Sequence, residues 1–312
     1  MICKLQDNRV RRTYLGGGRI DAFVGSAAIQ DGALRPEDWL ASTVTAYNGA
    51  VEIEGEGLGR LEDGRLVKDV VGSLPILVKL LDSDERLVIQ AHPTVPFAQT
   101  RMNSPVGKTE CWYFLPGTAP DACVYLGFKP GVTREKWRQA FESQTGLLEC
   151  LHRIPVQTGD FVFVDGGVPH AIGGGCFMIE LQEPSDLMVV AERVTPSGRT
   201  IPEGKIFCGL DLAGMLDVYS YEALSYEAVC ARYVRRGVGK RILGPELTDK
   251  FAMWRLASDC RELDLQGKSA IAVVTEGCGT INGCAVAKGD RLVVADERVV
   301  RVDGCVEVVV CV

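Results

Sequence analysis

The 312-residue chain lacks three features: a run of basic residues, an apolar run long enough to span a membrane, and a signal peptide. It has no run of Lys or Arg, and its net charge of -7 argues against nucleic acid or an anionic membrane as the main partner. No apolar stretch approaches the roughly eighteen residues of a membrane span, and the first residues lack the apolar core of a signal peptide. We therefore expect a cytoplasmic protein that acts on a small solute.

Disulfide and zinc-ribbon patterns are also missing, although the chain has twelve cysteines. None of them forms a C-x-x-C pair, and they are scattered through a long chain. This distribution predicts reduced thiols that pack as small apolar groups. Cys278 and Cys284 flank a turn, where packing is favoured over metal binding. Cys111 is the one cysteine that we consider for a functional role, because it lies beside Glu110.

The chain is rich in short apolar runs separated by Gly, Pro, Asp and Asn, which predict many strands and tight turns. We predict strands at 74–81, 87–92, 111–115, 122–128, 159–164 and 176–183, the first two being neighbours joined by a turn at 82–85. A short helix could begin at Pro36. A clearer helix is predicted from Arg134 to Gln144, with Thr133 as its N-cap. A partly helical connector at 211–227 precedes strands and turns from Phe251 onward.

The predicted fold is therefore dominated by strands, with two unequal domains. The first, residues 1–240, would carry the few helices and every histidine, because no histidine lies beyond His170. The second, residues 241–312, would be a smaller all-β domain. Any metal site that uses histidine belongs to the first domain.

Four polar residues in the first domain are candidate metal ligands. Gln90 and His92 are separated by one residue, so on a strand both side chains point to the same face. Glu110 follows after a loop, and His170 ends the segment G-D-F-V-F-V-D-G-G-V-P-H. Two imidazoles, a carboxylate and an amide oxygen suit Zn²⁺, although Fe²⁺, Mn²⁺ or Co²⁺ could also be bound. His152 has no comparable neighbour and is interpreted as a core residue.

Four sequence blocks resemble the signatures of class I, cupin-type mannose-6-phosphate isomerases. They are L-P-I-L-V-K-L-L-D, V-I-Q-A-H-P, G-K-T-E-C-W-Y and the segment that ends at His170. Their order and spacing match the family between about Leu74 and Asp186, with weaker similarity at 14–17 and 37–42. The resemblance implies two cupin-like β-barrel or jelly-roll domains with a few helices inserted in the first.

The resemblance also implies site residues and an activity. Zinc would be bound by Gln90, His92, Glu110 and His170, with Lys79 and Lys108 as active-site lysines. The implied reaction interconverts mannose 6-phosphate and fructose 6-phosphate through a cis-enediol. Glu180 matches a carboxylate that faces the pocket, although a strand residue at this position could equally point outward. Either Glu180 or a metal-linked water would move the proton, while cations stabilise the charge on oxygen.

The sequence departs from the family beyond Asp186, where an arginine usually follows four or five residues later. Val190 or Ala191 stands there instead. Arg193 is the nearest substitute, since it shares a strand face with Ala191 by parity, and Arg199 is a second possibility. This departure leaves two alternatives open: an isomerase for another sugar or sugar phosphate, and a cupin that binds a metal and a sugar without turnover.

Two further questions concern an alternative enzyme class and the residues that would bind a phosphate group. A cupin dioxygenase is disfavoured, because it would leave G-K-T-E and Lys79 unexplained. The expected ligand is a small sugar phosphate, yet no Walker-type loop marks a phosphate site, and Arg11, Arg12 and Ser42 are only possible contacts. The sequence carries no signal for the oligomeric state.

Overall fold

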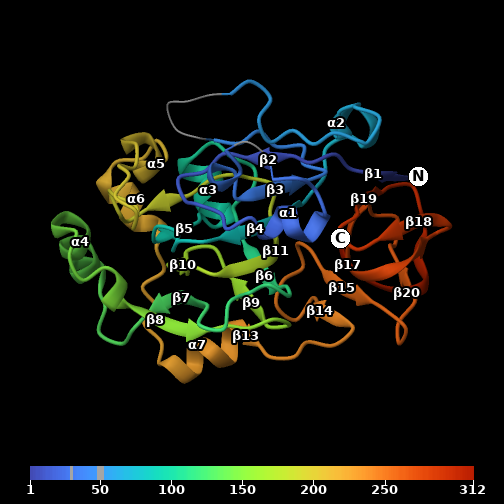
Figure 1. Ribbon diagram of the computed structural model, residues 1–312. Helices are drawn as coiled ribbons and strands as arrows, with labels where there is room; N and C mark the ends of the chain where they lie inside the picture. Colours follow the sequence, from blue (N-terminus) through green and yellow to red (C-terminus); the bar gives the residue numbers. More distant parts are fainter. Residues whose placement is uncertain (29–30, 48–52) are drawn as a thin grey trace.

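The computed structural model describes residues 1–28, 31–47 and 53–312, and most of its regular structure is β-sheet (Figure 1). The strands are β1 (Ile2–Lys4), β2 (Arg9–Val10), β3 (Glu37–Leu40), β4 (Leu77–Ser83), β5 (Gln90–Ala91), β6 (Glu110–Phe114), β7 (Cys123–Phe128), β8 (Leu151–Pro155), β9 (Phe161–Val164), β10 (His170–Ile172), β11 (Cys176–Gln182), β12 (Val189–Val190), β13 (Val234–Arg235), β14 (Arg241–Leu243), β15 (Met253–Leu256), β16 (Glu262–Asp264), β17 (Ala270–Ile281), β18 (Cys284–Ala287), β19 (Arg291–Val294) and β20 (Val299–Cys311).

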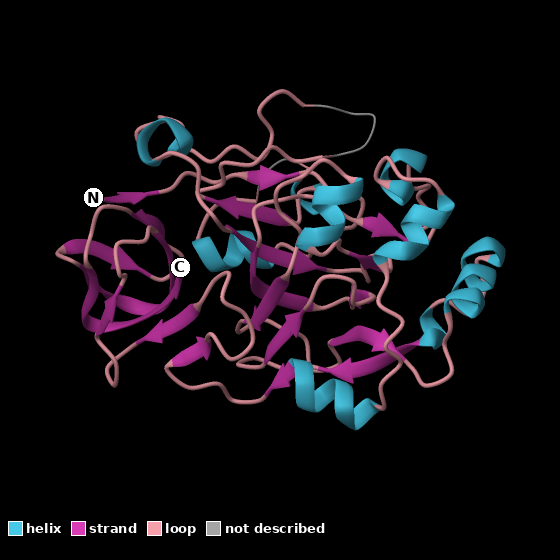
Figure 2. Ribbon diagram, turned by 180° about the vertical axis from the view of Figure 1, so that it is seen from behind, coloured by secondary structure: helices cyan, strands magenta, loops and turns pink. Residues whose placement is uncertain are grey.

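Short helices lie between the strands. They are α1 (Arg19–Val24), α2 (Val67–Val71), α3 (Val95–Arg101), α4 (Arg134–Ser143), α5 (Glu203–Phe207), α6 (Leu212–Val218) and α7 (Tyr226–Tyr233), with 3-10 turns at Gly32–Leu34 and Leu148–Cys150. Figure 2 shows these helices as short segments beside and between the strands. The predicted dominance of strands is confirmed.

The strands form three antiparallel sheets. A seven-stranded sheet has the order β13-β9-β6-β11-β4-β3-β2, and a five-stranded sheet has the order β12-β5-β10-β7-β8. An eight-stranded sheet at the other end of the molecule has the order β1-β19-β17-β20-β15-β14, with β16 beside β20 and β18 beside β17 (Figure 1). Each sheet combines strands that are far apart in the sequence, so long-range pairing organises the whole fold.

The eight-stranded sheet is buried on both faces over its central strands. Ile271 and Val273 of β17 belong to the apolar core that the seven-stranded sheet builds, whereas Ala272 and Val274 belong to a second core inside the eight-stranded sheet. This follows from the period of two along a strand. Strand β1 pairs with β19, so the start of the chain joins the C-terminal strands. The division into domains at residue 240 stays a prediction.

Two local predictions are wrong. Residues 37–40 form strand β3 between β2 and β4 rather than the start of a helix. Strands β4 and β5 do not pair either, because β4 lies in the seven-stranded sheet and β5 in the five-stranded one. Helix α4 is close to its predicted bounds, with the Thr133 side chain accepting a hydrogen bond from Lys136 N.

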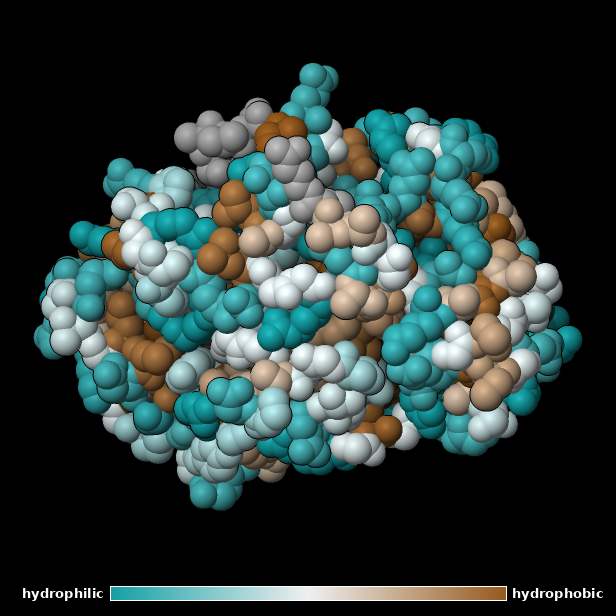
Figure 3. All heavy atoms as spheres, in the orientation of Figure 1, coloured by the Kyte–Doolittle hydropathy of each residue, from teal (hydrophilic) through white to brown (hydrophobic). Residues whose placement is uncertain are grey.

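The outer surface carries a mixture of side chains. Polar and apolar groups are interspersed over the face in Figure 3. Large exposed apolar side chains among the described residues are Tyr47, Ile53, Val194 and Tyr226. No helix within the described ranges is long and apolar enough to cross a membrane.

Candidate active site

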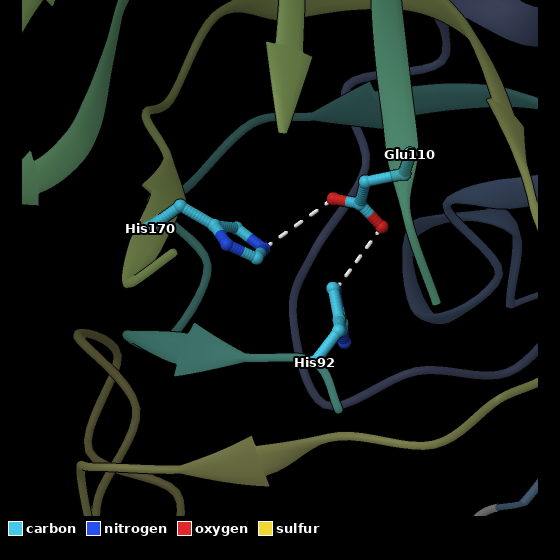
Figure 4. Close-up of side chains that lie close together, drawn as sticks. All are labelled: His92, Glu110 and His170. Atoms are coloured by element: carbon cyan, nitrogen blue, oxygen red, sulfur yellow. Dashed lines mark ion pairs between the residues drawn. The ribbon is translucent and has the colours of Figure 1, made fainter. Parts of the chain in front are cut away.

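Three predicted ligands converge at the junction of the two sheets of residues 9–235. Ligand atoms of His92, Glu110 and His170 all lie within 4.8 Å of one another, and all three residues are fully buried (Figure 4). His170 Nε2 lies 3.3 Å from Glu110 Oε1, and His92 Nε2 lies 3.1 Å from Glu110 Oε2. Gln90 Nε2 lies 3.3 Å from His170 Nε2. Because an amide can turn by 180°, Gln90 can present its oxygen instead.

Strand register explains why these residues meet. His170 of β10 is directly opposite Gln90 of β5 in the five-stranded sheet, so their side chains share a face. Glu110 is the first residue of β6 in the seven-stranded sheet. His92 directly follows β5, which brings its ring between the two sheets. The cluster therefore combines one residue from the seven-stranded sheet, two from the five-stranded sheet, and His92, which directly follows a strand of the latter.

Both imidazole rings are oriented by main-chain carbonyls. His92 Nδ1 lies 2.9 Å from Leu187 O, and His170 Nδ1 lies 2.9 Å from Val168 O. A ring nitrogen that donates to a carbonyl leaves the other nitrogen as a lone-pair acceptor, the arrangement common in metal-binding histidines. Burial, followed by the nearby Lys108 ammonium, lowers the pKa of His92 to about 3, which favours the neutral, ligating form.

The Glu110 carboxylate gives the clearest test of metal binding. Within the described part of the chain, neither of its buried oxygens has a hydrogen-bond partner of acceptable geometry. Burial alone would raise the pKa of Glu110, but the Lys108 ammonium together with His92 and His170 outweighs it and holds the pKa well below its usual range. Two acceptor nitrogens and an ionised carboxylate thus face one another, and such a donor set fits a divalent cation. The described residues contain a possible metal site.

Lys108 reaches the cluster from the loop before β6. Its Nζ lies 2.9 Å from Glu110 Oε2 and 3.0 Å from His92 Nε2. The loop packs tightly at Gly107, where a Cβ would lie 2.5 Å from Pro93 O and 2.8 Å from Val95 N. Glycine in G-K-T-E therefore permits the close approach that brings Lys108 and Glu110 toward His92.

A pocket adjoins the cluster, and Gln90 and Lys108 form the wall between them. Lys79 and Glu180 also line this pocket, and they are opposite each other on β4 and β11. Lys79 Nζ donates to Glu180 Oε1 at 2.7 Å, and Trp112 Nε1 donates to Glu180 Oε2 at 3.2 Å. Glu180 therefore points inward. Burial raises the pKa of Glu180, although Lys79 opposes this shift.

The pKa of Lys79 is raised as well. Burial opposes this shift, but the Glu180 and Glu37 carboxylates outweigh it. Lys79 Nζ lies 3.6 Å from Glu37 Oε2 and 5.0 Å from the centre of the Trp39 ring. These neighbours keep the lysine charged at neutral pH.

The far wall of the pocket carries ionic groups that the sequence predictions missed or left as one of several possibilities. Arg12 Nε donates to Glu37 Oε2 at 2.9 Å, and its two terminal nitrogens each donate to an oxygen of Asp186 at 3.0 Å. Tyr14 and Trp39 also donate to Glu37. A partial signal for these groups was present in the sequence, because Glu37 lies in a weakly matching block and Asp186 ends the strong one.

Lys205 of α5 lines the same pocket and was not predicted at all. By contrast, Arg193 is exposed and does not line it. The Arg193 guanidinium lies 5.3 Å from the centre of the Phe141 ring, and its backbone N donates to Gln144 Oε1. His152 is buried, with Nε2 2.9 Å from Leu224 O, as expected of a core residue. The roles predicted for all site residues stay predictions.

The overall fold matches that of cupin-like mannose-6-phosphate isomerases. A crystal structure of the mannose 6-phosphate isomerase from Bacillus subtilis superposes with a TM-score of 0.75 and 19% identity, covering 100% of this chain and 99% of the other. A mannose 6-phosphate isomerase bound with zinc and yttrium gives a TM-score of 0.70 and 16% identity, covering 99% and 98%. At these identities, the likeness establishes the fold class.

Sequence comparison adds named relatives. "Probable mannose-6-phosphate isomerase GmuF" of Bacillus subtilis is 40% identical over 114 residues, which cover 36% of this chain and 35% of the relative. "Mannose-6-phosphate isomerase ManA" of the same organism is 36% identical over 132 residues, which cover 42% and 40%. The chain thus matches well under half the length of these relatives. No family model matches. The predicted resemblance to mannose-6-phosphate isomerases is confirmed.

Proposed function

We propose that this chain is a zinc-dependent aldose-ketose isomerase that interconverts mannose 6-phosphate and fructose 6-phosphate through a cis-enediol. The observation that carries the proposal is the Glu110 carboxylate, which is fully buried, paired with Lys108, and faces two oriented imidazoles beside a pocket lined by lysines and carboxylates. The names of the relatives support the same activity. We also propose that the protein acts in the cytoplasm.

In this proposal, Gln90, His92, Glu110 and His170 would hold the zinc ion. The ion would supply positive charge next to the oxygens of the reacting carbons. Lys108 contacts two of these ligands and also lines the pocket, so its ammonium donates to a substrate oxygen as negative charge develops there. Lys79 holds Glu180 in place and adds a second positive charge.

Glu180 is the proposed proton carrier between the two reacting carbons. Its carboxylate accepts the proton from C2 of the aldose and returns it to C1 of the enediol, while the proton of the C2 hydroxyl passes to O1, which yields the ketose. Its raised pKa brings it closer to neutral pH, where a carboxylate both accepts and donates a proton effectively. Lys79 and Trp112 orient the two oxygens.

The Glu180 role predicts a large loss of rate in Glu180→Gln. The amide keeps the shape but cannot accept the proton, so we expect kcat to fall by about 10²-fold or more, with less change in KM. A coupled assay with mannose 6-phosphate measures both constants. Full isomerisation by this variant would exclude Glu180 as the proton carrier.

Metal removal provides a second prediction. Chelation should abolish turnover and lower the unfolding temperature by several degrees, because a ligand that binds only the folded state stabilises it. Added Zn²⁺ should restore both, and metal analysis of the purified protein separates zinc from iron, manganese and cobalt. A His170→Ala variant is the control, since its unfolding temperature should respond little to chelator or zinc.

A second candidate function is supported by the pocket wall at Val190. This apolar residue lines the pocket and is one of the two positions, Val190 and Ala191, where the resemblance would place an arginine. It favours a ligand that differs from mannose 6-phosphate, either another sugar phosphate that is isomerised or a sugar that is bound without turnover. A panel of sugars and sugar phosphates, tested for turnover and for binding with zinc-loaded protein, decides among these.

A further inference from the structure

Cys278 and Cys305 form a pair of exposed thiols that the proposed chemistry does not use. Strands β17 and β20 lie side by side in the eight-stranded sheet (Figure 1), and Cys278 is directly opposite Cys305. Both cysteines are exposed, which differs from the prediction that the cysteines pack as small apolar groups. Among the strand pairs of the described residues, this is the one position where two cysteines are opposite each other.

The turn between Cys278 and Cys284 does not make these two residues partners. Cys278 is opposite Ala287 of β18, and Cys284 is opposite Ile281 of β17. Cys284 is partly buried and packs against the apolar core inside the eight-stranded sheet. The partner of Cys278 is therefore supplied by β20, a strand that the spacing of the cysteines in the sequence does not indicate.

The two thiols share the outer face of the sheet. Residues directly opposite each other on antiparallel strands direct their side chains to the same face. The intervening positions face inward, since Ile281, three residues after Cys278, is buried in the core inside the sheet. Cys278 and Cys305 thus point away from that core and toward solvent, where a small reagent can reach both.

Glycines beside both cysteines let the two strands approach closely. Gly277 and Gly279 flank Cys278, and Gly304 precedes Cys305. A Cβ on Gly304 would lie 2.8 Å from Gly279 Cα, and a Cβ on Gly277 would overlap Cys305 O. Gly277 and Gly304 also have φ angles of 74° and 100°, which residues with a side chain rarely adopt. Glycine at these positions therefore keeps the backbones of the two cysteines close together.

The expected separation of the two cysteines suits a disulfide that forms and is reduced easily. Opposite residues of an antiparallel pair have Cα atoms about 4.5–5.5 Å apart, within the range of about 4.4–6.8 Å found in disulfides. Their Cβ atoms are about 4.5–5.5 Å apart, at or beyond the upper end of the range of about 3.5–4.5 Å in disulfides. Bond formation must draw the strands slightly together, and strained, exposed disulfides are the readily reduced ones.

We propose that Cys278 and Cys305 are a site of reversible oxidation, which forms a disulfide on reaction with a low-molecular-weight disulfide. The thiolate of one cysteine attacks a sulfur of the small disulfide, which releases one small thiol and leaves a mixed disulfide on the protein. The thiolate of the other cysteine attacks the protein sulfur of that bond, which releases the second small thiol and forms the Cys278–Cys305 bond. Two protein thiols are oxidised, one small disulfide is reduced, and the two protons pass to the released thiolates.

This inference does not rest on the proposed isomerase activity. Among the described residues that line the pocket beside the metal cluster, none belongs to β17 or β20. Disulfides in cytoplasmic proteins are mostly transient and redox-responsive, which agrees with a pair that is reduced until the small-thiol pool becomes oxidised.

The test treats the reduced, full-length protein with oxidised glutathione, alkylates the remaining thiols with iodoacetamide, and maps the peptides by mass spectrometry. In the wild type, we expect loss of both alkylated thiols of the pair, no glutathione retained on them, and a peptide linked through Cys278 and Cys305. Cys278→Ser and Cys305→Ser cannot form the bond, so each should retain one glutathione on the remaining cysteine. Dithiothreitol should reverse every product. Cys260→Ser removes a partly exposed thiol outside β17 and β20, and it should behave as wild type.

Three results would overturn the inference. They are stable glutathione on both cysteines of the wild type, a Cys278–Cys305 link that forms only after unfolding in urea, and a link between two chains in place of one within the chain. Exposed positions tolerate substitution, so the reduced serine variants should unfold at the temperature of the wild type. The peptide map of the wild type decides the question even if a serine variant fails to fold.

Discussion

At the scale of single residues, Arg193 shows that the alternation of side chains along a strand predicts their direction only as far as the strand itself extends. The predicted substitution of Arg193 for the family arginine assumes that residues 191 and 193 share a strand face. Strand β12 contains only Val189 and Val190, so alternation ends before Arg193. Its side chain lies over Phe141 instead of in the pocket.

The placement of Arg193 predicts a small effect of Arg193→Ala. We expect kcat/KM for mannose 6-phosphate to stay within about twofold, while stability falls by about 0.5–1 kcal/mol through the lost contact with the aromatic ring. The coupled assay and urea unfolding measure the two effects. A drop in kcat/KM of a hundredfold or more would instead support the catalytic role predicted from the sequence.

Apart from Arg193, the residues that the sequence predicted for the site meet in space, whereas their charged surroundings were largely missed. Gln90, His92 and Glu110 lie within one short stretch of sequence, so spacing alone suggested a shared site. Arg12 and Lys205 reach the pocket from distant segments, and nothing in their local sequence specifies a partner. Long-range ionic contacts are set by the tertiary fold and have no local pattern.

At the scale of elements, the loop before β6 determines how the metal cluster is built. Gly107 allows the loop to lie against the backbone at 93–95. We predict that Gly107→Ala displaces this loop, lowering zinc affinity by about tenfold or more and stability by about 1–3 kcal/mol. Competition with a chromogenic chelator measures the affinity. Gly239→Ala is the control, because a Cβ there meets nothing within 4 Å; equal effects of the two variants would contradict the prediction.

Elements were predicted best where local signals dominate. The N-cap Thr133 and the buried pair Trp137 and Phe141 specify helix α4 without help from the rest of the chain. Strand β3 was mistaken for a helix start because Pro36, which precedes Glu37 and Asp38, is typical of a first helical turn. Their charges are matched by Arg12 and Arg291, which are far away in the sequence. The residue pattern of a strand likewise does not identify the strand that pairs with it, which is why β4 and β5 were wrongly predicted to be neighbours.

At the scale of the whole molecule, Lys250 connects the C-terminal segment to the metal-binding loop. Its Nζ donates to Thr109 Oγ1 at 2.7 Å and to Glu183 Oε2 at 2.6 Å. Thr109 N donates to the same Glu183 oxygen at 2.9 Å. Thr109 lies between Lys108 and Glu110, so this contact fixes the backbone behind the site from outside the first two sheets.

This contact predicts that Lys250→Met weakens the distant site. The buried Glu183 carboxylate loses its cation, which should cost about 1–3 kcal/mol of stability, and zinc affinity should fall by several-fold as Thr109 loosens. Lys250→Arg should recover most of both, since it restores the charge. Lys268→Met, an exposed lysine of the same segment, should behave as wild type. Unchanged zinc affinity in Lys250→Met would mean that the C-terminal segment does not position the site.

The pairing of β1 with β19 also constrains the order of events during synthesis. Ile2 pairs with Val294, so β1 waits for a strand that is synthesised about 290 residues later, roughly fifteen to sixty seconds at typical elongation rates. Until then the edge of β1 lacks its partner β19, and β19 would in turn remain an open edge if β1 had been captured elsewhere. Completion of this sheet therefore comes late in the folding of residues 2–294, and the growing chain depends on avoiding wrong edge pairing until it occurs.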